Sequence, residues 1–265
     1  MSGNVADMSS GIHATAVIDN SAEIADDVTV GPYTVIGPNV TIGAGSIIGP
    51  HVHIVRDTIL GAGCKVHHGA ALGGDPQDLK YNNEPAELIV GDNTVVREFV
   101  TLNRGTSAHG RTEIGSNCLL MAYAHVAHDC VIGNHVILAN SVNMGGHVLI
   151  EDNVIVGGLT ALHQFVRVGK HAFVGGSAAV MKDVPPYVKA AGNPLKLYGL
   201  NSVGLQRRGF PEATRMTLKR AYRMIFSSSL NISQALEQAR RELEITPDVE
   251  HFLAFIAASQ RGVTV

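Results

Sequence analysis

Aliphatic side chains recur at every sixth position along most of this chain. The series begins at Ile12 and continues to Val180, and only Asp78, Glu84 and Ala108 interrupt it. Glycine often follows the repeated residue, and a small or β-branched residue usually stands four positions after it. A period of six fits neither an amphipathic helix nor a half-buried strand, but it fits a solenoid whose hexads are short strands followed by turns. The glycine is expected to permit a tight corner.

Hexad repeats of this kind resemble those of the left-handed parallel β-helix family, in which three hexads complete one triangular coil. The resemblance implies that residues 18 positions apart stack at about 4.8 Å, the spacing of neighbouring strands. The left hand comes from the resemblance, because crossovers between parallel strands are usually right-handed. We therefore predict a mainly β fold with an N-terminal extension over 1–11, a left-handed parallel β-helix over 12–183 and a C-terminal α-helical domain over 184–265.

Two polar segments interrupt the repeat. They are Gly73–Ile89 and Asn103–Glu113, and both contain residues that favour turns. Loops inserted into a solenoid gather on its working surface, so both segments are candidates for substrate contact. Neutral insertion is the alternative interpretation for each.

The repeat ends in a proline-rich stretch with a turn at Gly192–Pro194. Beyond it we predict three helices that cover the open end of the β-helix. The first spans Pro211–Phe226, the second runs from an N-cap at Ser233 to Leu243, and the third opens at Thr246–Pro247 and ends before Gly262.

The charge is unevenly distributed along the chain. Residues 1–183 hold 9 basic and 17 acidic residues, whereas residues 184–265 hold 11 basic and 6 acidic residues. A basic excess confined to one segment favours a localised anionic partner over general nucleic-acid binding. Six basic residues against one acidic residue lie between Arg207 and Arg223, which fits an acidic protein partner or, alternatively, a solvated helix face.

The remaining composition narrows the class of protein. No apolar run is long enough to span a bilayer, and the first eleven residues lack the features of a signal peptide, so a cytoplasmic protein is expected. Cys64, Cys118 and Cys130 share one phase of the repeat and have no metal-ligand spacing. We predict that these thiols pack in the core.

One edge of the predicted prism gathers polar side chains from successive coils. Residues 127–129, 145–147 and 163–165 stack there if each coil has 18 residues. They bring together His128, Asp129, His147, His163 and Gln164, with His125 just upstream. Two coil spacings correspond to about 10 Å, so the four histidines, the carboxylate and the amide are expected to converge. The other histidines are interpreted as surface or structural residues.

This group of side chains has a recognisable chemistry. A histidine beside a carboxylate is a natural general base near neutral pH. Gly145 and Gly146 bring bare backbone N–H groups to the same point, where they are candidate oxyanion donors. No Ser or Cys is placed as a nucleophile, which favours direct attack by a substrate hydroxyl over a covalent enzyme intermediate.

Six motifs connect the chain to a known family. They are QDLKY (77–81), AHVAHDC (124–130), GGHV (145–148), ALHQF (161–165), DVPPYV (183–188) and RRGF (207–210). Together they resemble the acyl-carrier-protein–UDP-N-acetylglucosamine O-acyltransferases, which begin lipid A synthesis, and the resemblance covers nearly the whole chain from Ile12. The polar start before Ile12 is longer than the family needs, and the second inserted segment is of uncertain length.

The resemblance implies roles for individual residues. His128 would take the proton from the sugar 3-hydroxyl as it attacks a 3-hydroxyacyl thioester on acyl carrier protein, Asp129 would orient His128, and the Gly146 N–H would stabilise the oxyanion. The substrate-binding residues would be Asp78 and Lys80 for the sugar and thioester region, His125, His147, His163 and Gln164 for the sugar nucleotide, and Asn201, Arg207 and Arg208 for the nucleotide and its phosphates. The family implies a homotrimer with the site between subunits, and no metal or other cofactor.

Several alternatives stay open. A metal enzyme on the same scaffold could recruit His128 and His147 as ligands, but it would leave the QDLKY and RRGF motifs without a role. A coenzyme A-dependent acetyltransferase of the hexapeptide class would need no carrier protein. A non-catalytic solenoid would tolerate the loss of His128. Within the carrier-protein family itself, the acceptor could be a 3-amino sugar nucleotide.

Overall fold

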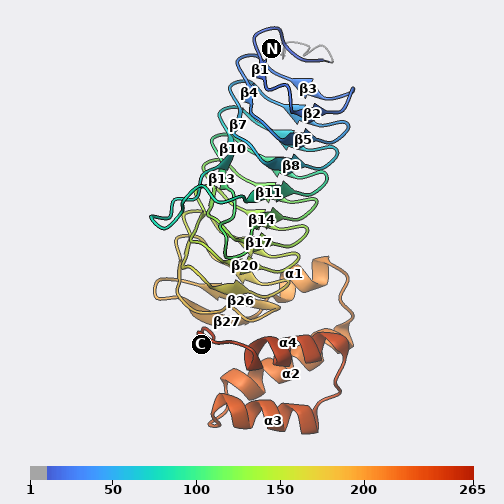
Figure 1. Cartoon of the computed structure of the whole chain (residues 1–265). Coiled ribbons are helices and arrows are strands. Elements are labelled where there is room, and N and C mark those ends of the chain that lie inside the picture. The colour runs from blue at the N-terminus through green and yellow to red at the C-terminus, as the bar shows by residue number, and fades with distance from the viewer. Residues whose placement is uncertain (1–10) are drawn as a thin grey trace.

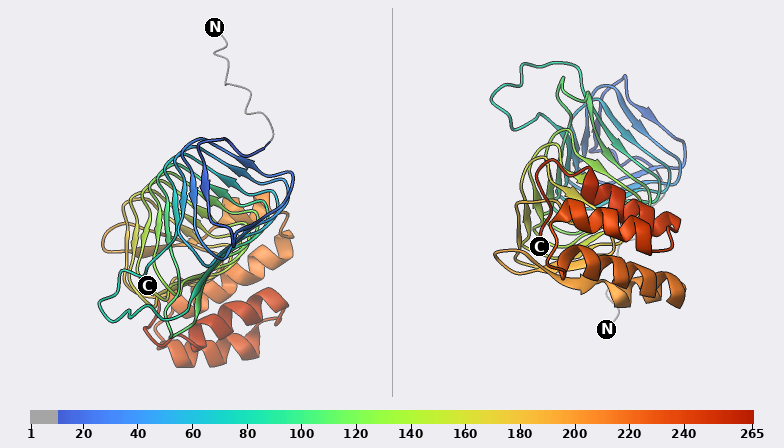
Figure 2. Two further views of the ribbon diagram at one scale, coloured as in Figure 1. Left: turned by 45° about the horizontal axis from the view of Figure 1, so that its top comes forward. Right: turned by 90° about the horizontal axis from the view of Figure 1, so that it is seen from below.

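The computed structural model describes residues 11–265 as a long prism that ends in a group of helices (Figure 1). Of the predicted N-terminal extension, only Gly11 falls within the described residues. Three parallel sheets form the sides of the prism, and each sheet takes every third strand of the chain. The predicted left-handed parallel β-helix is confirmed, and Figure 2 shows its coils stacked along one axis.

The strands are short and regularly spaced. The first sheet contains β1 (Val17–Ile18), β4 (Val35–Ile36), β7 (His53–Ile54), β10 (Ala71–Gly74), β13 (Thr101–Asn103), β16 (His125–Val126), β19 (Asn143–Met144), β22 (Ala161–Leu162) and β25 (Ala179–Val180). The second contains β2 (Glu23–Ile24), β5 (Val40–Ile42), β8 (Thr58–Leu60), β11 (Glu87–Val90), β14 (Arg111–Ile114), β17 (Val131–Ile132), β20 (Leu149–Ile150) and β23 (Arg167–Val168). The third contains β3 (Thr29–Val30), β6 (Ile47–Ile48), β9 (Lys65–Val66), β12 (Val95–Val96), β15 (Leu119–Leu120), β18 (Ile137–Leu138), β21 (Ile155–Val156), β24 (Phe173–Val174), β26 (Val188–Ala191) and β27 (Lys196–Leu200).

The repeated aliphatic residues fill the inside of the prism. Ile36 pairs with Ile54 in the next coil, and both side chains are buried. Burial of such stacked aliphatic groups is the main favourable term in folding. The three cysteine thiols are also buried and free, as predicted, and burial raises the pKa of Cys130 to about 12.

The glycine after each repeated residue has a different purpose from the one expected. Gly31 has an ordinary backbone conformation, but a Cβ on it would lie 2.8 Å from the carbonyl carbon of Gly49 in the next coil. The glycine therefore permits close approach of neighbouring coils. The left-handed conformation of the corner falls two residues later, on non-glycine residues such as Tyr33 with φ 58°.

The two inserted segments leave the count of six intact. Val90 pairs with Leu60, 30 positions earlier, and Ile114 pairs with Val90, 24 positions earlier, whereas an uninterrupted coil takes 18. The insertions therefore equal two hexads and one hexad, and the aliphatic series resumes in phase. Because β10, β11, β13 and β14 include the ends of the predicted segments, the loops themselves span 75–86, the first loop, and 104–110, the second loop.

The C-terminal region continues the third sheet before it becomes helical. β26 runs parallel to β24, and β27 returns antiparallel to β26 through the turn predicted at Gly192–Pro194. Four helices follow: α1 (Ser202–Arg207), α2 (Glu212–Phe226), α3 (Ile232–Glu242) and α4 (Pro247–Ala257). Figure 1 shows α2, α3 and α4 beyond the last coils.

The helix starts test the predicted caps. Thr246 caps α4 as predicted, and Pro247 is in its first turn. The N-cap at Ser233 was wrong, because Asn231 caps α3 and shares a capping box with Gln234. The short helix α1 was not predicted. Among residues 11–265, no helix combines the length and the apolarity that a membrane crossing requires.

Candidate active site

Three successive coils stack their corners between the first and second sheets. We call residues 127–129, 145–147 and 163–165 the histidine corner. The His147 N–H donates to the His128 carbonyl at 3.0 Å, and the Phe165 N–H donates to the Gly146 carbonyl at 3.1 Å. The predicted stacking is therefore confirmed, with His128, Gly146 and Gln164 in one column and Asp129, His147 and Phe165 in the next.

His128 and Asp129 form a hydrogen-bonded pair. His128 Nδ1 lies 2.7 Å from Asp129 Oδ2, and the Asp129 side chain is fully buried. Asp129 also accepts hydrogen bonds from the Thr106 N–H at 2.9 Å and from the Thr106 hydroxyl at 2.7 Å. Burial opposes ionisation, but these hydrogen bonds outweigh it and hold the pKa of Asp129 below its ordinary value. An ionised Asp129 favours the His128 tautomer with its proton on Nδ1, which leaves Nε2 free to accept a proton.

His147 packs beside this pair. Its Nε2 lies 3.8 Å from Asp129 Oδ2, and its ring meets the His128 ring edge-on with centroids 5.1 Å apart. Phe165 stacks on the other face of His147 at 4.5 Å. Burial lowers the pKa of His147, although the Asp129 charge acts against the shift. His147 is therefore neutral near pH 7 and can hydrogen-bond a polar ligand without competing for a proton.

Gly146 lies directly against the His128 ring. A Cβ at this position would sit 2.6 Å from His128 Cε1 and 2.7 Å from His128 Nε2. Any other residue would displace the imidazole, so glycine is required here. Gly146 is buried, and its N–H donates to no other group among residues 11–265. A buried N–H without a partner is costly, which is typical of a group that awaits a ligand oxygen.

The remaining histidine-corner candidates have other contacts. His125, on β16, hydrogen-bonds through Nδ1 to the Thr101 hydroxyl at 2.7 Å, and burial lowers its pKa. His163 Nδ1 lies 3.0 Å from the Gln164 carbonyl and 3.1 Å from Arg261 Nη2. Gln164 is exposed. Among the described residues, no hydrogen bond or ion pair joins His125, His163 or Gln164 directly to His128.

The first loop carries Asp78 and Lys80. The Asp78 carboxylate accepts from the Lys80 N–H at 2.9 Å, which forms a turn at the tip, and Lys80 is exposed. The charge of Asp78 is among those that raise the pKa of His147, so the loop reaches the electrostatic range of the histidine corner. The structure thus brings the two most polar features of the sequence close to each other.

Asn201, Arg207 and Arg208 surround the short helix α1 instead. Asn201 caps this helix by accepting from the Gly204 N–H at 3.2 Å, and it donates to the His171 carbonyl at 3.0 Å. Both arginines are exposed. Burial and then the Arg208 charge lower the pKa of His171 to about 4. Within one chain, the described contacts do not join these three residues to His128.

Thr106 is a site residue that the repeat did not reveal. It comes from the second loop, and it is the only side chain outside the corner that contacts the Asp129 carboxylate among the described residues. Its one sequence signal was its place in an insertion next to a strand end.

The same corner offers a set of potential metal ligands. One ligand atom each from His128, Asp129 and His147 lies within 4.8 Å of the others, and no other such group occurs among residues 11–265. However, Asp129 Oδ2 already lies in hydrogen-bond range of both His128 and the Thr106 hydroxyl. A metal ion would have to displace these partners.

Comparison with known proteins gives a consistent result. A family model described as UDP N-acetylglucosamine O-acyltransferase, domain 2, matches residues 183–264, and a bacterial transferase hexapeptide model matches residues 9–44 and 111–146. The acyl-(acyl-carrier-protein)–UDP-N-acetylglucosamine O-acyltransferase of Chlorobaculum parvum is 56% identical over 96% of this chain and 96% of its own length. The enzyme of the same name from Myxococcus xanthus is 49% identical over 96% of this chain and 98% of its own length.

Solved structures agree with the sequence relatives. LpxA from Acinetobacter baumannii superposes with a TM-score of 0.93 at 42% identity, covering 96% of this chain and 99% of that one. The UDP-N-acetylglucosamine acyltransferase from Bacteroides fragilis also gives 0.93, at 38% identity, with the same coverage of 96% and 99%.

Proposed function

This chain belongs to the UDP-N-acetylglucosamine O-acyltransferase family and is an acyltransferase, and from that premise we propose that it moves a (R)-3-hydroxyacyl chain from acyl carrier protein to the 3-hydroxyl of UDP-N-acetylglucosamine. This reaction is the first step of lipid A synthesis. The proposal is supported by relatives of that name that match nearly the whole chain, at 49% and 56% identity.

We assign the chemical step to His128. Its free Nε2 accepts the proton of the sugar hydroxyl as that oxygen attacks the thioester carbonyl, and the Gly146 N–H donates to the oxyanion that forms. Collapse of the tetrahedral intermediate breaks the C–S bond, and the imidazolium returns its proton to the departing thiolate of the carrier. Asp129 keeps the imidazole in the required tautomer and stabilises its protonated form. The observation that carries this assignment is the buried, threonine-held Asp129 on His128 Nδ1.

The mechanism needs no covalent enzyme intermediate. The three cysteine thiols are buried, and burial raises the pKa of each. A buried thiol with a raised pKa is a poor nucleophile. Direct attack by the sugar hydroxyl is therefore the simpler route.

The other polar residues hold the substrates. Asp78 and Lys80 contact the sugar and the thioester region from the first loop. His125, His147, His163 and Gln164 contact the sugar nucleotide, and Asn201, Arg207 and Arg208 contact the nucleotide and its phosphates. Arginine suits a diphosphate because its planar fork of N–H donors matches phosphate oxygens.

We also propose a homotrimer with its sites between subunits. The first loop stands away from the prism (Figure 1), and Leu79 at its tip is fully exposed. Asn201, Arg207 and Arg208 have no contact with the histidine corner of their own chain, so a neighbouring copy would have to bring the two groups together. Cyclic association would bury such exposed apolar side chains. The basic residues of α2, which include Arg215, Lys219, Arg220 and Arg223, would then receive the acidic carrier protein.

An acyl-transfer assay tests the reaction. Purified protein is mixed with UDP-N-acetylglucosamine and 3-hydroxyacyl carrier proteins of graded chain length, and the acylated sugar nucleotide is measured. We expect transfer from one preferred length and none from acetyl-coenzyme A. Absence of transfer from every length would overturn the proposal, and parallel reactions with a 3-amino sugar nucleotide and with acetyl-coenzyme A would show which alternative replaces it.

A metal-dependent reaction is the second candidate, because His128, Asp129 and His147 offer three ligand atoms within 4.8 Å. Zinc sites commonly use such ligands. Acyl transfer that survives exhaustive chelation, followed by metal analysis of the active protein, would exclude it. Activity that is lost on chelation and restored by one metal would replace our assignment of His128.

A further inference from the structure

Arg104 is one of the largest fully buried side chains in the molecule. Only 1% of its surface is exposed, although it carries a permanent positive charge. Burial of an unpaired guanidinium would cost several kcal/mol, so its partners define its role. Arg104 opens the second loop, and all its side-chain partners belong to the start of the first loop or to the strand that leads into it.

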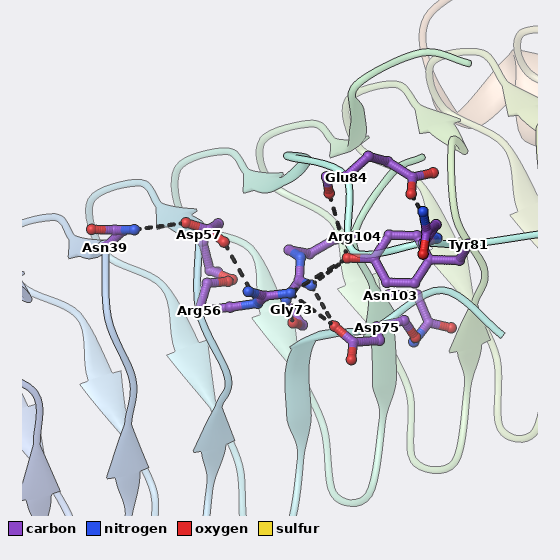
Figure 3. Close-up of polar contacts among 11 residues, drawn as sticks. Asn39, Arg56, Asp57, Gly73, Asp75, Tyr81, Glu84, Asn103 and Arg104 are labelled. Carbon is purple, nitrogen blue, oxygen red and sulfur yellow. Dashed lines mark hydrogen bonds and ion pairs between the residues drawn. The ribbon is translucent and has the colours of Figure 1, made fainter. Parts of the chain in front are cut away.

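These partners stand at both ends of one short segment (Figure 3). Arg104 Nη1 donates to the Gly73 carbonyl at 2.6 Å. Arg104 Nη2 donates to Asp75 Oδ1 at 2.5 Å and to the Tyr81 hydroxyl at 3.0 Å. One nitrogen atom therefore bridges two residues six positions apart. Asp78, Leu79 and Lys80 lie between them.

The backbone of the same region strengthens this closure. The Arg104 N–H donates to the Gly74 carbonyl at 3.0 Å, and Asn103 Nδ2 donates to the Asp75 carbonyl at 2.9 Å. Farther along, the Ser107 N–H lies 3.3 Å from Glu84 Oε1. The second loop thus contacts the first loop from its base to its far end.

The second loop also contacts the catalytic pair. Thr106, two residues after Arg104, donates both its N–H and its hydroxyl to Asp129. The chain between the two anchors is too short to absorb much movement, because two residues span at most about 7 Å when extended. The position of the first loop is therefore linked to that of Asp129.

From this arrangement we propose that Arg104 is a positioning residue that closes the segment between Asp75 and Tyr81 and so presents Asp78 and Lys80 to the substrates in a fixed place relative to His128. The proposal rests on the proposed function for the roles of Asp78 and Lys80. It differs from a purely structural role because it requires the effect of Arg104 on catalysis to pass through the first loop.

Proteolysis tests the closure without any assay of activity. Trypsin cleaves after lysine, and Lys80 is exposed within the closed segment. We expect Arg104→Met to accelerate cleavage between Lys80 and Tyr81 at least about tenfold, since cleavage follows the population of the open segment. Arg111→Met is the matched control, because Arg111 is an exposed arginine just after the second loop and pairs only with Glu113. An unchanged rate in Arg104→Met would overturn the closure.

A double-mutant cycle tests the link to catalysis. Lys80→Ala and Arg104→Met are each expected to lower kcat/KM for acyl transfer about tenfold or more. If Arg104 acts through the loop, Lys80→Ala costs less than about twofold in the Arg104→Met background. Losses that multiply would mean that Arg104 acts elsewhere, and wild-type kcat/KM in a variant with an opened loop would mean that the loop does not present substrate contacts. Either result overturns the proposal.

A milder variant guards against misfolding. Tyr81→Phe removes only the hydroxyl that Arg104 Nη2 contacts and keeps the ring. It should accelerate cleavage and lower kcat/KM in the same direction, each about threefold, and absence of both effects would overturn the proposal even if Arg104→Met does not fold. If the wild-type protein transfers no acyl group at all, the proposed function fails, but the proteolysis result still decides whether the segment is closed.

Discussion

The same repeat builds two different corners on this prism. The histidine corner lies between the first and second sheets. Between the third and first sheets lies what we call the aromatic corner, formed by the exposed side chains of Tyr33, His51, His68, Phe99 and Tyr123. Their rings stack from coil to coil with centroids 5.1 to 5.4 Å apart. Both corners thus arise from one backbone pattern.

His68 and His128 occupy equivalent places in these two corners. Each stands two positions after a repeated aliphatic residue, Val66 or Val126. His68 contacts the rings of His51 and Phe99. His128 contacts a buried carboxylate that the second loop holds through Thr106. The solenoid supplies the position of a histidine, but a partner from outside the repeat supplies its chemistry.

The largest predicted effect contrasts these two histidines directly. His128→Ala removes the general base and should lower kcat/KM for acyl transfer about 10³-fold, within the range that such bases contribute. His68→Ala should change it less than about threefold, because it removes only an exposed ring. Steady-state kinetics of both variants, with sugar-nucleotide binding measured by calorimetry, provide the check. Equal losses in the two variants would remove the distinction between the corners.

A smaller effect is expected when the outside partner is weakened. Thr106→Val keeps the shape of the side chain but removes the hydroxyl that donates to Asp129. A hydrogen bond to a charged group contributes about 1.5–3 kcal/mol, so kcat/KM should fall roughly tenfold. The pKa of Asp129 should also rise, which moves the acid side of the pH–rate profile to higher pH.

Thr94→Val is the matched control for Thr106→Val. Thr94 is buried like Thr106, but its hydroxyl donates to the Gly115 carbonyl at 2.8 Å and contacts no carboxylate. This control should lower the melting temperature and leave the pH profile of the folded enzyme unchanged. A pH profile of Thr106→Val identical to that of wild type would show that Thr106 does not tune Asp129.

The smallest effect concerns a histidine with cationic neighbours instead of a carboxylate at its side. Burial, then Arg208 and Lys170, lower the pKa of His171 to about 4, below its ordinary 6.5. Protonation therefore favours the unfolded state, so the stability from neutral His171 is full above pH 6.5 and is lost as the pH falls toward 4. After allowance for solvent screening, we expect a loss of about 1–2 kcal/mol between pH 7.5 and pH 5.

Urea unfolding at these two pH values checks this prediction. The reference variant is His171→Asn, because asparagine tolerates the left-handed backbone at this position, where φ is 59°. Comparison across pH within each protein cancels the lost ring contacts. The free energy of unfolding of His171→Asn should change less with pH than that of wild type, and equal changes would contradict the role of His171.

Much of the fold could be predicted because the information is local. Each hexad repeats the same burial, so Ile36 and its equivalents fixed the register, and the 18-residue coil placed His128 beside His147 before any coordinates existed. The insertions did not disturb this register because they are whole numbers of hexads. The reason for the glycine after each repeated residue was misread, since close approach between coils depends on residues 18 positions away.

The parts that escaped prediction depend on loops and termini. Thr106 reaches Asp129 through a conformation that no repeat encodes, and Arg104 looked like an ordinary polar loop residue although it is buried. Asn231 competed with Ser233 as a cap, and both residue types are good caps, so propensity alone could not choose between them. The roles of the individual substrate-binding residues stay predictions.

Chemical rescue of His128→Ala tests the central claim most directly. The variant leaves an imidazole-sized space against Gly146, and turnover is measured while imidazole is added to the assay. The account predicts that turnover is nearly abolished without imidazole and rises with the concentration of its unprotonated form, while sugar-nucleotide binding stays close to that of wild type. Wild-type turnover by His128→Ala without any added base would contradict the assignment of His128 as the general base.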